Sequence, residues 1–146
     1  MNEDELVHRR VFHAPRELVW RCLTDPMELA QYWGPRGMAT PVDGIVVELH
    51  PGGRFETVML GVHGSYRMVA TFTDVVPPER LAWLDSATGM HTTSTLHDLG
   101  DGMTAVVIQQ RNVPEAMRTP EARDGFLTSL DKLEEHLAHL KPGDQS

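Results

Sequence analysis

The chain has 146 residues, of which 40% are apolar and 23% charged, a composition typical of a folded globular domain. Its formal net charge is −8 and its longest basic run is the pair Arg9-Arg10, so we expect no binding to nucleic acid or to a membrane surface. The single cysteine, Cys22, excludes an intramolecular disulfide. An acidic start and the lack of an apolar run of ~20 residues favour a cytoplasmic protein without a membrane span.

A short strand is predicted first. Residues 6–12 alternate polar and apolar side chains through Val7, Arg9 and Val11, which is the pattern of a half-buried strand.

Two short helices are predicted next. Pro15 suits a first helical position, and the apolar residues that follow recur at helical spacing: Val19, Trp20 and Leu23. Asp25-Pro26 repeats the signal as a capping acid before a proline, and Gly34-Pro35 is expected to end the second helix after Trp33.

From about residue 45 to residue 113 the sequence is rich in β-forming residues. Turn signals divide this stretch at Pro51-Gly52-Gly53, residues 61–64, Pro77-Pro78, residues 86–89 and Gly100-Asp101-Gly102. Because parallel pairs need crossovers of a dozen or more residues, these short breaks predict six consecutive antiparallel strands, and seven with the first.

A long amphipathic helix is predicted near the end. Thr119-Pro120 is its start signal, and one apolar stripe runs through Phe126, Leu130, Leu133, Leu137 and Leu140. Asp131, Glu134 and Glu135 are expected to face water, and Pro142-Gly143 to close the helix. Since the sheet is the one large partner, the helix should lie across its concave face in a single α+β domain, residues 1–146, with an ordered core of about residues 5–140.

This order of elements, together with several local phrases, resembles the helix-grip fold of the START-like (SRPBCC) superfamily. The phrases are VFHAPRELVW at residues 11–20, YWGP at residues 32–35, HPGGRF at residues 50–55 and DVVPPERL at residues 74–81. Together they are similar to the activator-of-Hsp90-ATPase-homologue branch over almost the entire chain. Two positions depart from the branch: Gly125-Phe126 stands where Gly-Trp is frequent, and Gln110 stands where many relatives have histidine. The second departure weakens any acid–base role at that position.

Metal binding and covalent catalysis are not expected. His136 and His139 lie three residues apart on the last helix, but no third ligand is fixed near them in the sequence, so we expect both to be exposed. Cys22 lies beside Leu23 and is expected to be a small packed side chain. Gly-x-Ser-x-Gly, Walker A and Gly-x-Gly-x-x-Gly motifs are absent, so no catalytic residue and no cofactor is predicted.

An apolar pocket between the sheet and the long helix is expected instead. Its candidate ligand-binding residues combine bulky walls, adaptable methionines and small polar groups: Trp33, Met59, Met68, Leu81, Trp83, Met90, Thr92, Ser94, Gln110, Phe126 and Leu130. Each residue alone suits a solid core equally well. Collectively they favour a pocket, because a strongly curved sheet that grips one helix is difficult to fill completely.

Three functions are compatible with such a pocket. The first is non-enzymatic binding of a small, largely apolar molecule. The second, which the resemblance implies, is a polyketide cyclase or dehydratase; it needs an inward acid or base among Tyr66, Asp74, Asp85 and His91, whose directions the sequence leaves open. The third is a chaperone-interaction module, as the family name implies. The sequence gives neither the ligand nor the pathway, and it leaves a homodimer open.

Overall fold

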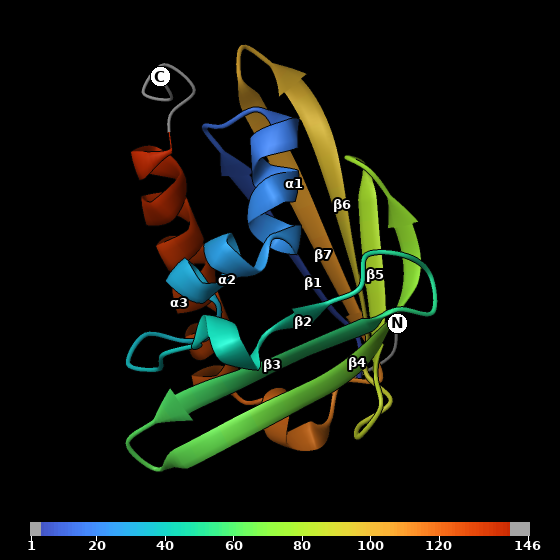
Figure 1. Cartoon of the computed structure of the whole chain (residues 1–146), viewed down its shortest axis with the longest axis vertical. Helices are drawn as coiled ribbons and strands as arrows, with labels where there is room; N and C mark the ends of the chain where they lie inside the picture. Colours follow the sequence, from blue (N-terminus) through green and yellow to red (C-terminus); the bar gives the residue numbers. More distant parts are fainter. Residues whose placement is uncertain (1–3, 141–146) are drawn as a thin grey trace.

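The computed structural model describes residues 4–140, which form one antiparallel sheet with helices packed on one of its faces (Figure 1). The strands are β1 (Leu6–Phe12), β2 (Val46–Val47), β3 (Arg54–Gly61), β4 (Gly64–Val76), β5 (Arg80–Asp85), β6 (His91–Gly100) and β7 (Met103–Arg111). The helices are α1 (Arg16–Thr24), α2 (Pro26–Tyr32) and α3 (Pro120–His139), with 3-10 turns η1 (Val42–Gly44) and η2 (Glu115–Met117). None of the helices within residues 4–140 is long and apolar enough to cross a membrane.

The sheet order is β1-β7-β6-β5-β4-β3-β2, so successive strands from β2 to β7 pair as neighbours and β1 closes onto β7. Every pair is antiparallel. The prediction of seven antiparallel strands, two short helices and one long C-terminal helix is therefore confirmed, and the architecture is an α+β helix-grip fold.

The helix starts follow local capping chemistry. Asp25 before α2 and Thr119 before α3 each accept a hydrogen bond from a backbone N–H two or three residues further on, and a proline follows each of them. Pro15 instead has an extended backbone and caps α1, which begins at Arg16, one residue later than predicted. The predicted stop at Pro142-Gly143 lies outside the described residues.

The Pro-Gly-Gly phrase forms the tight connection that leads into β3. Gly52 has a φ of +86°, a region that favours glycine. At Gly53 a Cβ atom would lie 2.0 Å from the carbonyl oxygen of Glu48. The backbone at Glu48 therefore lies too close to position 53 for any residue with a side chain. The two glycines are therefore required for different reasons, one for its dihedral angle and one for its close approach.

The prediction of a half-buried strand left the buried face of β1 open, and the structure determines it. Val7 is 60% exposed, whereas Phe12 is fully buried, so the face that packs inward carries Leu6, His8, Arg10 and Phe12. The reason lies in α3: Arg10 donates a hydrogen bond to Asp131 over 2.6 Å, and the His8 ring packs against Phe126. Polar side chains occupy the inner face because partners across the fold satisfy them.

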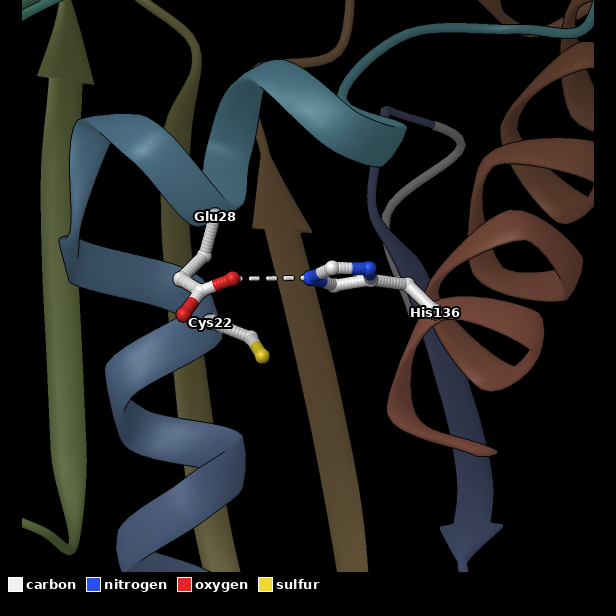
Figure 2. Close-up of side chains that lie close together, drawn as sticks. All are labelled: Cys22, Glu28 and His136. Carbon is white, nitrogen blue, oxygen red and sulfur yellow. Dashed lines mark hydrogen bonds and ion pairs between the residues drawn. The ribbon is translucent and has the colours of Figure 1, made fainter. Parts of the chain in front are cut away.

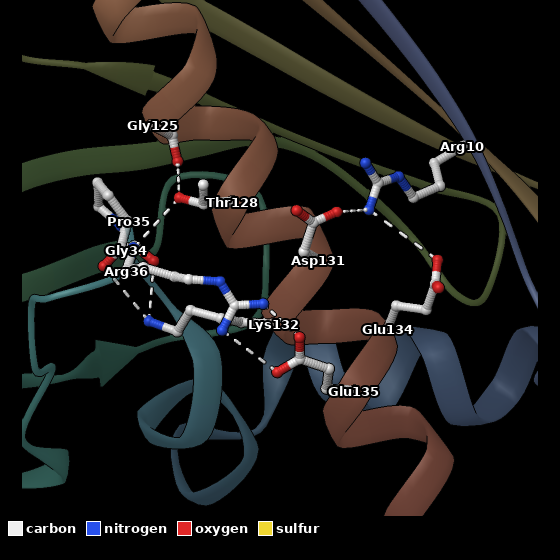
Figure 3. A network of polar contacts seen from close by, with 10 residues as sticks. All are labelled: Arg10, Gly34, Pro35, Arg36, Gly125, Thr128, Asp131, Lys132, Glu134 and Glu135. Atoms are coloured by element: carbon white, nitrogen blue, oxygen red, sulfur yellow. Dashed lines mark hydrogen bonds and ion pairs between the residues drawn. The ribbon is translucent and has the colours of Figure 1, made fainter.

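Helix α3 is held on both of its sides (Figure 3). On one side Arg10 of β1 pairs with Asp131 and approaches Glu134 to 4.0 Å. On the other side Arg36, in the loop after α2, pairs with Glu135. The three acids were predicted to face water, and they remain half-exposed but paired. These contacts fix the helix over the inner face of the sheet, which is the face that carries the buried core.

Candidate functional site

The strand register places most of the predicted pocket residues on the inner face. Thr92 of β6 lies between Trp83 of β5 and Gln110 of β7. Ser94, two residues further along β6, lies opposite Leu81. Because side chains two residues apart share a face, these five form one continuous patch under α3.

One half of the inner space is filled by aromatic rings. Phe55 of β3 stacks on Phe72 of β4, with ring centroids 5.2 Å apart. It also meets Trp83 edge-on at 5.0 Å and Trp33, at the end of α2, at 5.5 Å. Trp33 in turn lies 6.2 Å from Trp83. This part of the predicted pocket is therefore filled by a packed aromatic core that includes Trp33 and Trp83.

The other half of the patch is polar and buried. Thr92 and Ser94 are 3% exposed and Gln110 is 8% exposed. Within residues 4–140 the fully buried side-chain atoms that lack a hydrogen-bond partner belong to Arg16, Thr57 and Arg118, and not to these three residues. The patch therefore offers hydroxyl and amide groups on a face that is otherwise apolar.

The first half of α3 covers this region. Phe126 is partly buried and packs against His8, and Leu130 is 7% exposed. Met68 of β4 is likewise a partly buried residue packed against the core, and Met59 of β3 is of intermediate burial. Met90 was predicted to lie on a strand, but it precedes β6 in the turn from β5, where it is buried.

The loop after α2 lies between the first half of α3 and the sheet and contacts both of them (Figure 3). Lys132 donates to the carbonyl oxygen of Gly34 over 3.0 Å, and the backbone N–H of Arg36 donates to the Thr128 hydroxyl. On the sheet side, a Cβ atom at Gly34 would lie 2.7 Å from the sulfur of Met59. Gly34 is therefore the point at which the loop passes between α3 and β3.

Sequence and structure comparisons place this geometry in a known group. Residues 13–138 match the family described as "Activator of Hsp90 ATPase homolog 1-like protein". The chain belongs to this family. Family membership by itself does not set a function, because one fold hosts many activities.

Several solved structures share the fold of this chain. A protein from Nitrosomonas europaea is 26% identical, covers 96% of this chain and 97% of its own, and superimposes with a TM-score of 0.83. A protein from Chromobacterium violaceum is 27% identical over 90% of this chain and 95% of its own, with a TM-score of 0.79. A protein from Rhodobacter sphaeroides is 25% identical over 96% and 95%, with a TM-score of 0.83. No curated protein matches the sequence.

Two of the acid–base candidates in this AHSA1-like chain face away from the helices. Asp74 forms an ion pair with Arg80 on the solvent side of the sheet. His91 lies opposite the exposed Leu84, and its Nε2 is 2.9 Å from the Thr73 hydroxyl. Neither side chain reaches the inner face.

The other two candidates face inward. Asp85 is buried, but its Oδ1 accepts hydrogen bonds from the backbone N–H groups of Ala87 and Thr88, so it shapes the turn before β6. Tyr66 lies opposite Met59 at the open end of the inner face and is half-exposed. Burial, and then the charge of Asp85, raise the pKa of its phenol. Tyr66 is therefore neutral at physiological pH and serves as a hydroxyl group.

His8 is a further inner-face residue that was not among the predicted site residues. Its ring centroid lies 4.7 Å from that of Phe126, beside the polar patch. Burial, and then the nearby charge of Arg123, lower its pKa. The alternation of residues 6–12 places His8 on the same face as Phe12, and the burial of Phe12 marks that face as the inner one.

Two open grooves lie beside α3 outside the sheet. One, of about 520 Å³, is lined by residues that include Arg36, Lys132 and His136. The other, of about 510 Å³, has mostly apolar side chains, and Trp33 is one of them. Trp33 thus lines this groove and also packs on Phe55 and Trp83 of the sheet.

A second cluster lies where the three helices meet (Figure 2). Glu28 of α2 accepts a hydrogen bond from Arg21, and its other oxygen is 2.9 Å from Nε2 of His136. Burial raises the pKa of Glu28, but the hydrogen bonds from His136 and Arg21 outweigh it and leave the pKa below its usual value. The prediction of an exposed His136 is wrong, because its side chain is 13% exposed; His139 is exposed as predicted.

Cys22 of α1 completes this cluster. It is fully buried, and burial followed by the charge of Glu28 raises the pKa of its thiol to about 12. A protonated thiol is a poor nucleophile, which agrees with the packed role expected for this residue. The expectation that no further ligand atom lies near His136 is wrong, however, because Cys22 and Glu28 both do.

Proposed function

We propose that this chain binds one small, largely apolar molecule on the inner face of the sheet, between β5–β7 and the first half of α3. One observation carries the proposal: the polar side chains of Thr92, Ser94 and Gln110 gather at one place on that buried and otherwise apolar face. A few polar groups in apolar surroundings are what orients a small ligand in a binding site.

The surroundings define what such a ligand looks like. Leu81 and Trp83 border the polar patch on the β5 side, and Phe126 and Leu130 cover it. The walls are thus apolar, and the hydrogen-bonding groups are confined to one spot. This arrangement suits a molecule with a hydrophobic body and a hydroxyl, carbonyl or amide group at one end.

Binding is a better account of this site than catalysis. A general acid or base must lie within hydrogen-bond reach of the reacting atom. Asp74 and His91 point away from the inner face, and Asp85 is engaged by its own turn. The polar groups of the patch itself are hydroxyl and amide groups, which orient a ligand but do not exchange protons near neutral pH. His8 is an inward-facing imidazole beside the patch, and its ring packs against Phe126.

A thermal-shift screen of fatty acids, sterols, flavonoids and polyketides tests the proposal. A ligand present at 100 times its Kd stabilises the folded state by about 2.7 kcal/mol, which should raise the melting temperature by several degrees. Leu130→Trp should abolish the shift by filling the space under α3. Ala138→Trp, on an exposed position of the same helix, should retain it. If no compound stabilises the protein, the proposal fails.

Thr92→Val is expected to weaken binding of the best compound from that screen by up to about tenfold. The variant removes one hydrogen bond to the ligand's polar group, and such bonds contribute about 0.5–1.5 kcal/mol. Thr93→Val, on the opposite face of β6, is the matched control and should leave the affinity unchanged. Isothermal titration calorimetry measures both. Equal losses in the two variants would mean that the ligand does not contact the inner face.

A further inference from the structure

Three side chains with metal-ligating atoms converge from three different helices: Cys22 from α1, Glu28 from α2 and His136 from α3 (Figure 2). One ligand atom from each, the cysteine sulfur, a carboxylate oxygen and an imidazole nitrogen, lies within 4.8 Å of the other two. The cluster is remote in sequence, since 108 residues separate Glu28 from His136. It lies outside the proposed ligand site on the inner face of the sheet.

We propose that Cys22, Glu28 and His136 bind a single divalent cation of the zinc type. Thiolate, imidazole and carboxylate are the three kinds of ligand that proteins offer to zinc. Magnesium and calcium prefer oxygen ligands alone, so a site with sulfur and nitrogen discriminates against them. Three protein ligands leave a fourth tetrahedral position for water or a small molecule.

The distances suit this coordination after small side-chain movements. Zinc bonds of about 2.0–2.3 Å place tetrahedral ligand atoms roughly 3.3–3.8 Å apart. The contact between Glu28 Oε1 and His136 Nε2, now 2.9 Å, must open slightly. The widest separation, at most 4.8 Å, must close by up to about 1 Å.

The neighbouring groups support the ligands. Arg21 binds Glu28 Oε2 at 2.7–2.9 Å, which leaves Oε1 directed at His136. The Tyr32 ring stacks on the His136 ring with centroids 6.4 Å apart, and its hydroxyl donates to the carbonyl oxygen of Cys22 over 2.8 Å. Such outer contacts orient ligands and are part of a working metal site.

The site also has an entry path and a balanced binding step. His136 lines the groove of about 520 Å³ beside α3, so solvent reaches the edge of the cluster. On binding, the S–H bond of Cys22 breaks, its proton passes to solvent and a sulfur–metal bond forms, with no change in oxidation state. A hydrogen-bonded pair of Glu28 and His136 on its own would not need a cysteine beside it.

Cobalt titration of the purified full chain, stripped of metal by a chelator, tests this proposal. Cobalt chloride should produce a thiolate-to-cobalt charge-transfer band that saturates at one equivalent, and zinc chloride should remove it. Cys22→Ser should lose the band. Glu28→Gln and His136→Gln should each weaken cobalt binding at least about tenfold, the lower end of what losing even an outer partner costs.

His139→Gln is the matched control, since His139 is the exposed histidine on the same helix. Its band and affinity should match those of the parent chain. The proposal is overturned if the parent chain shows no band at stoichiometric cobalt, if Cys22→Ser keeps it, or if His139→Gln loses it. Circular dichroism in metal-free buffer checks that each variant folds, and Cys22→Ala replaces Cys22→Ser if the serine variant does not. A failure here leaves the thermal-shift and calorimetric tests of ligand binding unaffected.

Discussion

Replacing Phe55 by alanine is expected to lower the free energy of unfolding by about 3–5 kcal/mol. Phe55 is fully buried, and its ring contacts those of Trp33, Phe72 and Trp83 at centroid distances of 5.0–5.5 Å. The truncation removes three aromatic pairs at once, each worth about 0.5–1.5 kcal/mol beyond the area it buries. It also leaves a cavity between the end of α2 and the sheet, which the surrounding backbone cannot close.

Urea unfolding measures this effect, and Val62→Ala is the control. Val62 is 92% exposed at the β3–β4 turn, so its truncation should change stability by less than about 0.5 kcal/mol. A loss below about 1.5 kcal/mol in Phe55→Ala would mean that the aromatic rings form a loosely packed wall of the pocket rather than a core.

The elements of this fold were predictable because their signals are local. Asp25-Pro26 and Thr119-Pro120 fix helix starts through hydrogen bonds that span two or three residues. Gly52 and Gly53 mark a turn whose dihedral angle and close approach are set within the same few residues. Short breaks between strands then leave an antiparallel sheet as the one simple arrangement.

The inner face of β1 was not predictable from local pattern. Alternation gives two faces, and each of them carries two apolar residues, so the pattern does not choose between them. The fold buries the face of Phe12, where Arg10 contacts Asp131 and His8 contacts Phe126, each more than a hundred residues away. Those contacts form only when α3 packs on the sheet. The sequence of residues 6–12 alone therefore could not predict which face of the strand is buried.

The residues of the candidate site divide in the same way into those that could be predicted from the sequence and those that could not. Leu81 and Trp83 on one strand and Thr92 and Ser94 on the next share a face by simple alternation, and the register confirms it. The cluster at Cys22 follows no such period, because its members come from three helices whose relative positions are set by tertiary packing. Patterns within an element predict its faces, whereas contacts between elements must be observed.

Two fully buried threonines should respond in opposite directions when each is replaced by valine. Thr57 on β3 is 0% exposed, and its hydroxyl has no hydrogen-bond partner among residues 4–140. Thr104 on β7 is also 0% exposed, but its hydroxyl donates to the carbonyl oxygen of Ala14 over 2.7 Å. Valine has nearly the same shape as threonine, so the comparison isolates the hydroxyl group.

Thr57→Val should raise the free energy of unfolding by about 1–3 kcal/mol, because it removes an unsatisfied buried group. Thr104→Val should lower it by about 1–3 kcal/mol, because it leaves the Ala14 carbonyl without this donor. Urea unfolding of both variants at unchanged m-value measures the difference. If Thr57→Val is destabilising, its hydroxyl has a partner in solution, such as a buried water. The inner face near β3 would then be hydrated, and the ligand site would extend from the polar patch at Thr92 toward Met68, which lies opposite Thr57.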